Sequence, residues 1–288
     1  MSPHVHPTLE NIHFELVRLA AESPVSEGFP AYLFRGERSD YEDTFTSMDR
    51  HYHQHPLESK VYDQLDDLTN FVMKSLFPSG PLPPRYAAAF AQHYGLPTQM
   101  FDFNSSANVA AFFAANRAIH KDRPRIGKMG ILDVRNALDS KKCDLFDLRT
   151  FPEALRARRQ HAFGLIYSGF RSDDRYSIKD KSLADEIGLE WWSFAHLPDD
   201  ESFLYAIGAE EDLLSTDGDD FAGLAQEFVD QYVAIRGPLS VEAAAIVSSN
   251  ISPIGRTPEQ NRDLWAGTQQ RPLPTASSAI QRTRPASR

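Results

Sequence analysis

The chain has 288 residues, of which 41% are hydrophobic, so it can bury a sizeable core. Its formal net charge of -10 argues against broad binding to nucleic acids or anionic membranes, because both require a net basic face. Cys143 is the single cysteine, which excludes an internal disulfide and a multi-cysteine zinc site and favours a reducing compartment. No stretch approaches the roughly 18 apolar residues of a membrane span, and no signal-peptide pattern opens the sequence. A cytoplasmic protein without membrane contact is therefore expected.

Helical and extended patterns alternate in the first hundred residues. Residues 1–29 are expected to form an N-terminal helix region, because apolar residues recur at helical spacing between 9 and 20. A short buried strand is predicted at residues 31–34, bounded by Gly and Pro. Helices are predicted at 58–76 and 85–92.

Arg35 and Gly36 follow the first predicted strand directly. An arginine at the end of a buried strand is costly to desolvate unless it meets an anion. That anion is either a ligand phosphate or an internal carboxylate such as Asp102. For Asp102 itself, orienting Arg35 is slightly favoured over contact with a substrate. If the strand continues, Glu37 lies on the same face as Arg35 and opposite Gly36.

The stretch from 91 to 115 combines a turn, a short strand and the start of a buried helix. Gly95 and Pro97 predict the turn, and the apolar run that includes Phe101 and Phe103 predicts the strand. Asn104, Ser105 and Ser106 are all suited to cap the helix that follows, and its apolar residues predict burial on more than one face. This polar elbow is a natural ligand site, at which His93 would either bond a ribose hydroxyl, act as a general base or fix the turn.

The second half of the chain adds strands, two helices and a charged loop. Strands are predicted at residues 129–134, 161–167 and 187–194, and helices at 221–232 and 241–247. Nine acidic residues and no basic one lie between 199 and 220, which predicts a solvated acidic insert rather than a calcium loop. Residues 252–288 are expected to be a flexible, basic, proline-containing tail. Residues 30–251 are expected to form one α+β domain.

Three histidines alternate at His51, His53 and His55 and would share a face on an extended segment. No cysteine lies near them and the acidic neighbours are scattered, so no metal is predicted there. A metal-dependent hydrolase that uses these histidines or His93 with Asp102 is kept as a minor alternative.

Several motifs occur in an order that resembles the FRG domain family, named for its Phe-Arg-Gly motif. They are LFRG at 33–36, QHYGLPTQMFDF at 92–103, an Ala-Phe-Phe-Ala helix at 111–114, and RRQHAFG at 158–164. The resemblance covers roughly residues 30–170. The family continues its second motif with Arg-Leu-Leu-Asp-Trp-Thr, whereas this chain has Gln99-Met-Phe-Asp-Phe-Asn104.

The resemblance implies a comparison with Arg-Ser-Glu type ADP-ribosyltransferases, and hence a split, mostly antiparallel central sheet flanked by helices. By that comparison Arg35 holds the dinucleotide phosphates of NAD, and Ser105 or Ser106 shapes the nicotinamide pocket. The implied cofactor-binding set is Arg35, Gly36, Tyr94, Asp102, Ser105 and Ser106, and the implied catalytic set is Gln160, Glu190, Glu37 and His93. Gln160 stands where a carboxylate would be wanted, and a glutamine supplies no negative charge to a developing cation.

Two functions are therefore compared. The first is an NAD-using ADP-ribosyltransferase-like enzyme, a toxin or defence effector whose acceptor is a protein or a nucleic acid. The alternative is a non-catalytic module of the FRG family that binds a nucleotide or another ligand.

Overall fold

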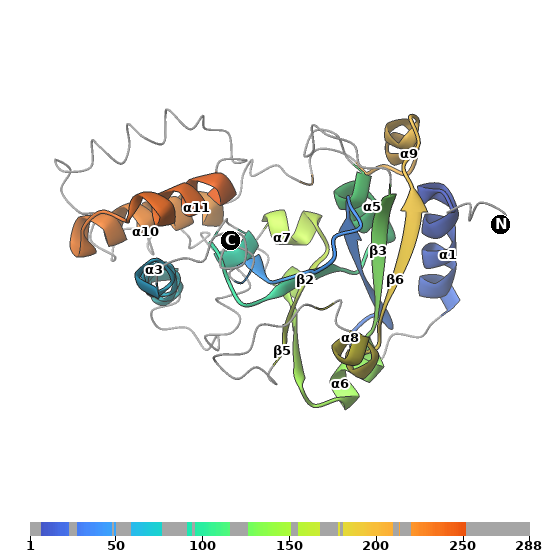
Figure 1. The fold of residues 1–288 in the computed structure, drawn as a ribbon, viewed down its shortest axis with the longest axis horizontal. Helices are drawn as coiled ribbons and strands as arrows, with labels where there is room; N and C mark the ends of the chain where they lie inside the picture. Colours follow the sequence, from blue (N-terminus) through green and yellow to red (C-terminus); the bar gives the residue numbers. More distant parts are fainter. Residues whose placement is uncertain are drawn as a thin grey trace, which may run out of the picture.

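A computed structural model places a six-stranded sheet at the centre of the protein (Figure 1). It describes residues 7–22, 28–47, 49, 59–76, 91–93, 96–115, 126–150, 155–167, 178, 181–209, 213 and 220–251. The strand order is β4-β5-β2-β1-β3-β6, and these neighbours pair in antiparallel fashion. A mixed helix-and-strand protein with an antiparallel central sheet, as the sequence predicts, is confirmed.

The strands are β1 (Tyr32–Glu37), β2 (Phe101–Asn104), β3 (Ile126–Asp133), β4 (Cys143–Asp147), β5 (Ala162–Tyr167) and β6 (Leu189–Ala195). The helices are α1 (Leu9–Glu22), α3 (Ser59–Leu76), α5 (Ala107–Ala115), α6 (Val134–Asp139), α7 (Leu155–Arg159), α8 (Lys181–Ile187), α9 (Asp200–Ala206), α10 (Asp220–Arg236) and α11 (Val241–Ile251), with a 3₁₀ turn η1 at Leu148–Thr150. None of the helices in these described ranges is long and apolar enough to cross a membrane.

Alternation along β1 sends its side chains into two separate cores. Phe34 packs with Leu16 of α1, Phe112 of α5 and Phe194 of β6, under a cover that α9 completes. Leu33 points to the opposite face and packs in a core to which β2, β5, α6 and α8 contribute. The sheet is therefore buried on both faces at its centre.

A third core lies between helices rather than on the sheet. Leu65 and Leu68 of α3 pack with Val229 of α10 and Val247 of α11. Figure 1 shows these three helices gathered on one side of the molecule, at the opposite side from α1 and β6. Ala91 and Leu96 also belong to this core, so it supports the segment that leads into β2.

Helix α5 approaches β1 unusually closely at Gly36. A Cβ on Gly36 would lie 1.8 Å from the carbonyl oxygen of Ala110 and 2.8 Å from the amide nitrogen of Ala114. No other residue type fits there without moving the helix. Ser106 precedes α5 and its hydroxyl accepts from the amide of Val109 at 3.5 Å, which caps the helix start as its sequence position suggests. Gly36 thus allows the close packing of α5 on β1, and Ser106 stabilises the start of that helix.

Several short elements were not predicted. β4, α6, α7 and α8 each have five to seven residues, too few for a hydrophobic period to stand out. Helix α9 occupies the beginning of the acidic stretch that was expected to be a loop. Local signals nevertheless mark the ends of two of these helices. Asp133 caps α6 by accepting from the amide of Asn136, and Gly188 ends α8 with a positive φ of 72°.

Candidate functional site

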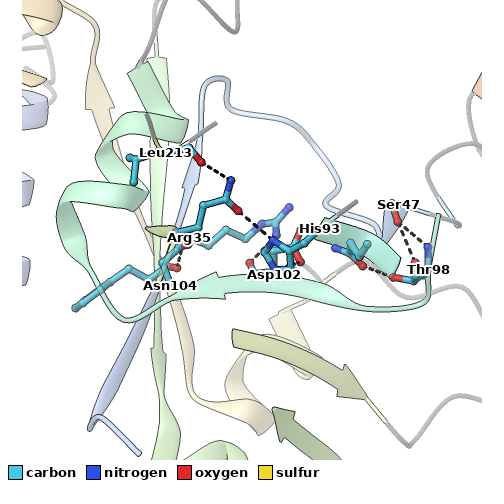
Figure 2. A network of polar contacts seen from close by, with 10 residues as sticks. Arg35, Ser47, His93, Thr98, Asp102, Asn104 and Leu213 are labelled. Carbon is cyan, nitrogen blue, oxygen red and sulfur yellow. Dashed lines mark hydrogen bonds and ion pairs between the residues drawn. The ribbon is translucent and has the colours of Figure 1, made fainter. Parts of the chain in front are cut away.

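Strands β1 and β2 meet over a short distance, with Phe34 paired to Asn104. The side-chain amide of Asn104 donates to the carbonyl oxygen of Phe34 at 3.4 Å. Arg35 is the next residue of β1, and its Nη1 donates at 2.8 Å to the backbone carbonyl oxygen of Asp102, which lies two residues before Asn104 in β2. A guanidinium therefore joins the strands next to their one Cα pair, and Figure 2 shows Arg35 reaching toward Asp102 in this way.

The carboxylate that pairs with Arg35 is Glu37, which corrects the expected pairing with the Asp102 carboxylate. Nε of Arg35 lies 3.3 Å from Oε1 of Glu37, so the two side chains share a face of β1 as alternation predicts. The Arg35 side chain is 15% exposed and that of Glu37 is 6% exposed. The hydroxyl of Thr44 also donates to Glu37, at 2.8 Å. Arg35 is thus already bonded at two of its nitrogens within the protein.

His93 is held at the entrance to β2 by a network of turn contacts. The amide of Leu96 donates to the carbonyl oxygen of Ala91 at 2.9 Å, which closes the turn after the helical residues 91–93. The amide of Thr98 donates to the hydroxyl of Ser47 at 2.8 Å, and its hydroxyl bonds the side chain of Gln92. Figure 2 shows Ser47 and Thr98 on one side of His93 and Asp102 on the other.

Gln160 follows α7 and connects His93 to a distant part of the chain. Its Nε2 donates to the carbonyl oxygen of Leu213 at 2.9 Å, and its Oε1 lies 3.0 Å from Nδ1 of His93. Gln160 is 4% exposed and His93 is 8% exposed, so both groups are removed from water. Both polar atoms of the Gln160 side chain, which was expected in a catalytic position, therefore form buried hydrogen bonds within the protein.

The other nitrogen of His93 faces the carboxylate of Asp102. Nε2 of His93 lies 3.8 Å from Oδ1 of Asp102, and neither of these buried atoms has a hydrogen-bond partner in the described part of the chain. The Asp102 side chain as a whole is 41% exposed, so the part of the carboxylate away from Oδ1 is open to solvent. Buried polar atoms are nearly always hydrogen-bonded, so a water molecule or a bound ligand could pair with these two atoms.

Burial lowers the pKa of His93 from its ordinary 6.5. The negative charge of Asp102 on β2 raises the pKa, the positive charge of Arg156 on α7 lowers it, and the hydrogen bond to Gln160 raises it. Because burial is the largest of these effects, His93 is uncharged near neutral pH. A neutral imidazole can accept a proton or a hydrogen bond.

The two serines have separate surroundings. Ser106 caps α5, whereas the hydroxyl of Ser105 accepts from Nη1 of Arg149 at 3.3 Å. Arg149 is in turn paired with Asp147 at 2.7 Å. The amide of Ser105 donates to the carbonyl oxygen of His161 at 3.0 Å. The serine motif thus joins α5 to β5.

Glu190 is not brought to Arg35. It lies on β6, which is separated from β1 by β3, and it is exposed, accepting from Nε1 of Trp192 at 3.3 Å. Alternation from Phe194 puts Glu190 on the face of α1 and α5, whereas Arg35 lies on the opposite face.

The space beside Gly36, which was expected to admit a ligand, is filled by the backbone of α5. Tyr94 and the three histidines His51, His53 and His55 lie outside the described residues. Within the described ranges no group of three or more His, Cys, Asp or Glu side chains could hold a metal ion.

Two contributors to the site carried no signal in the sequence. The carbonyl of Leu213 is a backbone group, and nothing in a sequence reports which carbonyl a distant amide reaches. Thr44 lies in an irregular polar segment, where its bond to Glu37 has no pattern. The candidate site consists of His93, Asp102 and Gln160, and Arg35 and Glu37 support it from β1.

Comparison with known families gives one match. Residues 30–123 match the family model of the FRG domain. Searches of curated proteins and of solved structures found no match. The matched segment includes Phe34-Arg35-Gly36, His93 and Asp102, and it ends before Gln160, so the expected extent of 30–170 is longer than the match. Over residues 30–123 the chain is therefore similar to the FRG domain.

Proposed function

We propose that the protein binds a nucleotide-class ligand whose ribose hydroxyls donate to His93 and Asp102. The observation that carries the proposal is that Nε2 of His93 and Oδ1 of Asp102 lie 3.8 Å apart, both buried and both without a hydrogen-bond partner among the described residues. The two vicinal hydroxyls of a ribose, one against each atom, give each acceptor its own donor. A carboxylate that accepts from a ribose hydroxyl is a recurring device of dinucleotide sites.

The charges around the pair fit one orientation of such a ligand. Asp102 is half-exposed and repels phosphate, so the ribose and not the phosphate would lie against it. Helix α7 carries Arg156, Arg158 and Arg159, and the effect of Arg156 on the pKa of His93 puts positive charge near the pair. The phosphates would lie toward α7. This orientation does not use Arg35, which is bonded to Glu37 and Asp102.

A second candidate is ADP-ribosyl transfer from NAD, and the partly exposed Asp102 beside a neutral His93 favours it. In that reaction the C1′–N bond to nicotinamide breaks and nicotinamide leaves with the electron pair. The carboxylate of Asp102 would stabilise the oxocarbenium-like ribose, in the role that neither Gln160 nor Glu190 is placed to take. An acceptor hydroxyl would then bond to C1′, and its proton would pass to Nε2 of His93.

Calorimetric titration with NAD, ADP-ribose and adenosine tests the binding proposal. The expected result is binding by the wild type, loss of binding in Asp102→Ala and His93→Phe, and unchanged binding in Glu190→Gln. Glu190→Gln is the matched control because it removes an exposed carboxylate from the distant strand β6. Failure of all three ligands to bind the wild type contradicts the proposal.

Nicotinamide release from NAD separates the two candidates. Binding without release supports the binding module, and release that disappears in Asp102→Ala but persists in Glu190→Gln supports the transferase.

A further inference from the structure

We infer that Gln160 is a positioning residue, which fixes His93 as the tautomer with hydrogen on Nδ1, so that Nε2 acts only as an acceptor. The first step concerns the amide of Gln160. A backbone carbonyl oxygen can only accept, so the group of Gln160 that lies 2.9 Å from the carbonyl of Leu213 must be its NH₂. The amide orientation is thereby determined, and Oε1 faces His93.

The orientation of the Gln160 amide determines which nitrogen of the His93 imidazole carries the hydrogen. Oε1 of Gln160 can only accept, and it lies 3.0 Å from Nδ1 of His93, so Nδ1 must carry a hydrogen. A neutral imidazole has one hydrogen only. Nε2 therefore presents a lone pair, 3.8 Å from an oxygen of Asp102 that can also only accept when ionised.

The consequence for the ligand rests on the proposed function. Two adjacent acceptors select a ligand group that can donate, such as a hydroxyl or an amine. They reject a phosphate or carbonyl oxygen, because the acceptors of both protein and ligand would then be buried without a hydrogen bond, which costs free energy. Gln160 is thus a specificity-determining residue, although it does not touch the ligand. The carbonyl of Leu213, within the acidic stretch of residues 199–220, takes part in setting that specificity.

The chain contains a matched control in His13 of α1. Nε2 of His13 lies 2.8 Å from Oδ1 of Asn108, and Nδ2 of Asn108 donates to the carbonyl oxygen of Ile207 at 2.7 Å. The same reasoning puts a hydrogen on Nε2 of His13. An amide and a backbone carbonyl therefore fix both histidines, at opposite ring nitrogens.

Long-range ¹H–¹⁵N correlation spectra of the full chain, labelled at histidine and recorded without ligand near pH 7.5, test the inference. His93 is expected to show a protonated Nδ1 and an unprotonated Nε2, and His13 a protonated Nε2 in the same spectrum. In Gln160→Leu the preference of His93 for Nδ1 is expected to disappear, whereas Asn108→Leu, a comparable loss of a buried amide, leaves His93 unchanged. A hydrogen on Nε2 of wild-type His93, or an unchanged tautomer in Gln160→Leu, overturns the inference.

The affinity for adenosine is measured separately from the tautomer, so that failure of the inference and failure of the proposed function can be distinguished. The tautomer is measured without ligand, so failure of adenosine or NAD to bind rejects the proposed function alone. Where adenosine binds the wild type, Gln160→Leu is expected to weaken its binding about tenfold and Asn108→Leu to leave it unchanged, in line with the loss of one acceptor hydrogen bond. Equal affinity of the wild type and Gln160→Leu overturns the role in specificity.

Discussion

The guanidinium of Arg35 donates to the backbone carbonyl oxygen of Asp102 at 2.8 Å, and this bond joins β1 to β2 beside their one Cα pair. Its charge is matched by the buried carboxylate of Glu37. In this protein the arginine of the Phe-Arg-Gly motif therefore connects β1 to β2 through hydrogen bonds within the protein.

Replacing Arg35 with alanine is expected to lower the free energy of unfolding by about 3 kcal/mol, because it removes the positive charge that pairs with the buried carboxylate of Glu37. Arg135→Ala, at a side chain that is 84% exposed, is the control and is expected to change the free energy by less than about 0.5 kcal/mol. Urea denaturation measures both. Equal, small effects of the two substitutions would show that the Arg35 contacts contribute little.

Gly36→Ala is expected to destabilise the fold by about 3 kcal/mol, because its Cβ would lie 1.8 Å from the carbonyl oxygen of Ala110. Gly208→Ala is a useful comparison: its φ is 68° and no atom lies within 4 Å of the added Cβ, so only backbone strain of about 1 kcal/mol is expected. Thermal melting of the two variants compares these costs. Similar melting temperatures would contradict the close packing of α5 on β1.

Asp102→Asn is expected to stabilise the protein by about 1 kcal/mol and to abolish nucleotide binding. The amide of the new side chain can donate to Nε2 of His93 after a small shift, and this gives the unpaired nitrogen a partner. Asp63→Asn, an exposed change of the same charge on α3, is the control and should alter neither property. Calorimetric unfolding and ligand titration measure the two effects, and a destabilised Asp102→Asn contradicts the proposed geometry.

Stability should fall as the pH drops below about 6.5, because burial lowers the pKa of His93 in the folded protein below that value. The unfolded chain then takes up a proton that the folded chain does not, so unfolding is favoured until the folded pKa is reached. His93→Gln lacks this ionisation and should lose less stability than the wild type over the same range. A wild-type advantage that grows toward low pH would contradict the sign.

Cys143 is expected to be unreactive in the folded protein. Burial raises the pKa of its thiol from the ordinary 9.0 to about 11, which lowers the thiolate fraction at pH 8 about 100-fold. Modification by a thiol reagent should therefore be slow in buffer and fast in urea. Fast modification of the folded chain contradicts the buried position.

The sequence predicted the parts of the fold that have local causes. Alternation put Glu37 beside Arg35, and Ser106 was a suitable cap for a helix whose apolar residues required burial on several faces. Short elements such as β4 were missed because five residues that include Asp144 and Asp147 show no clear period.

The candidate site was predicted only in part, for a similar reason. His93 and Asp102 stood out as polar residues at a buried turn. Their mutual position depends on tertiary contacts, and the bond from Gln160 to the carbonyl of Leu213 spans 53 residues. The sequence indicated a carboxylate partner for Arg35 but not which one, because Asp102 offers its backbone carbonyl and Glu37 its side chain.

The most direct test of the central claim is the ¹⁵N chemical shift of Nε2 of His93 as adenosine or NAD is added. We expect a saturable shift of this unprotonated nitrogen as a ligand hydroxyl donates to it, while the shifts of the His13 nitrogens stay unchanged. A ligand that saturates the protein and leaves Nε2 of His93 unchanged would contradict the account, because the nucleotide would then bind elsewhere.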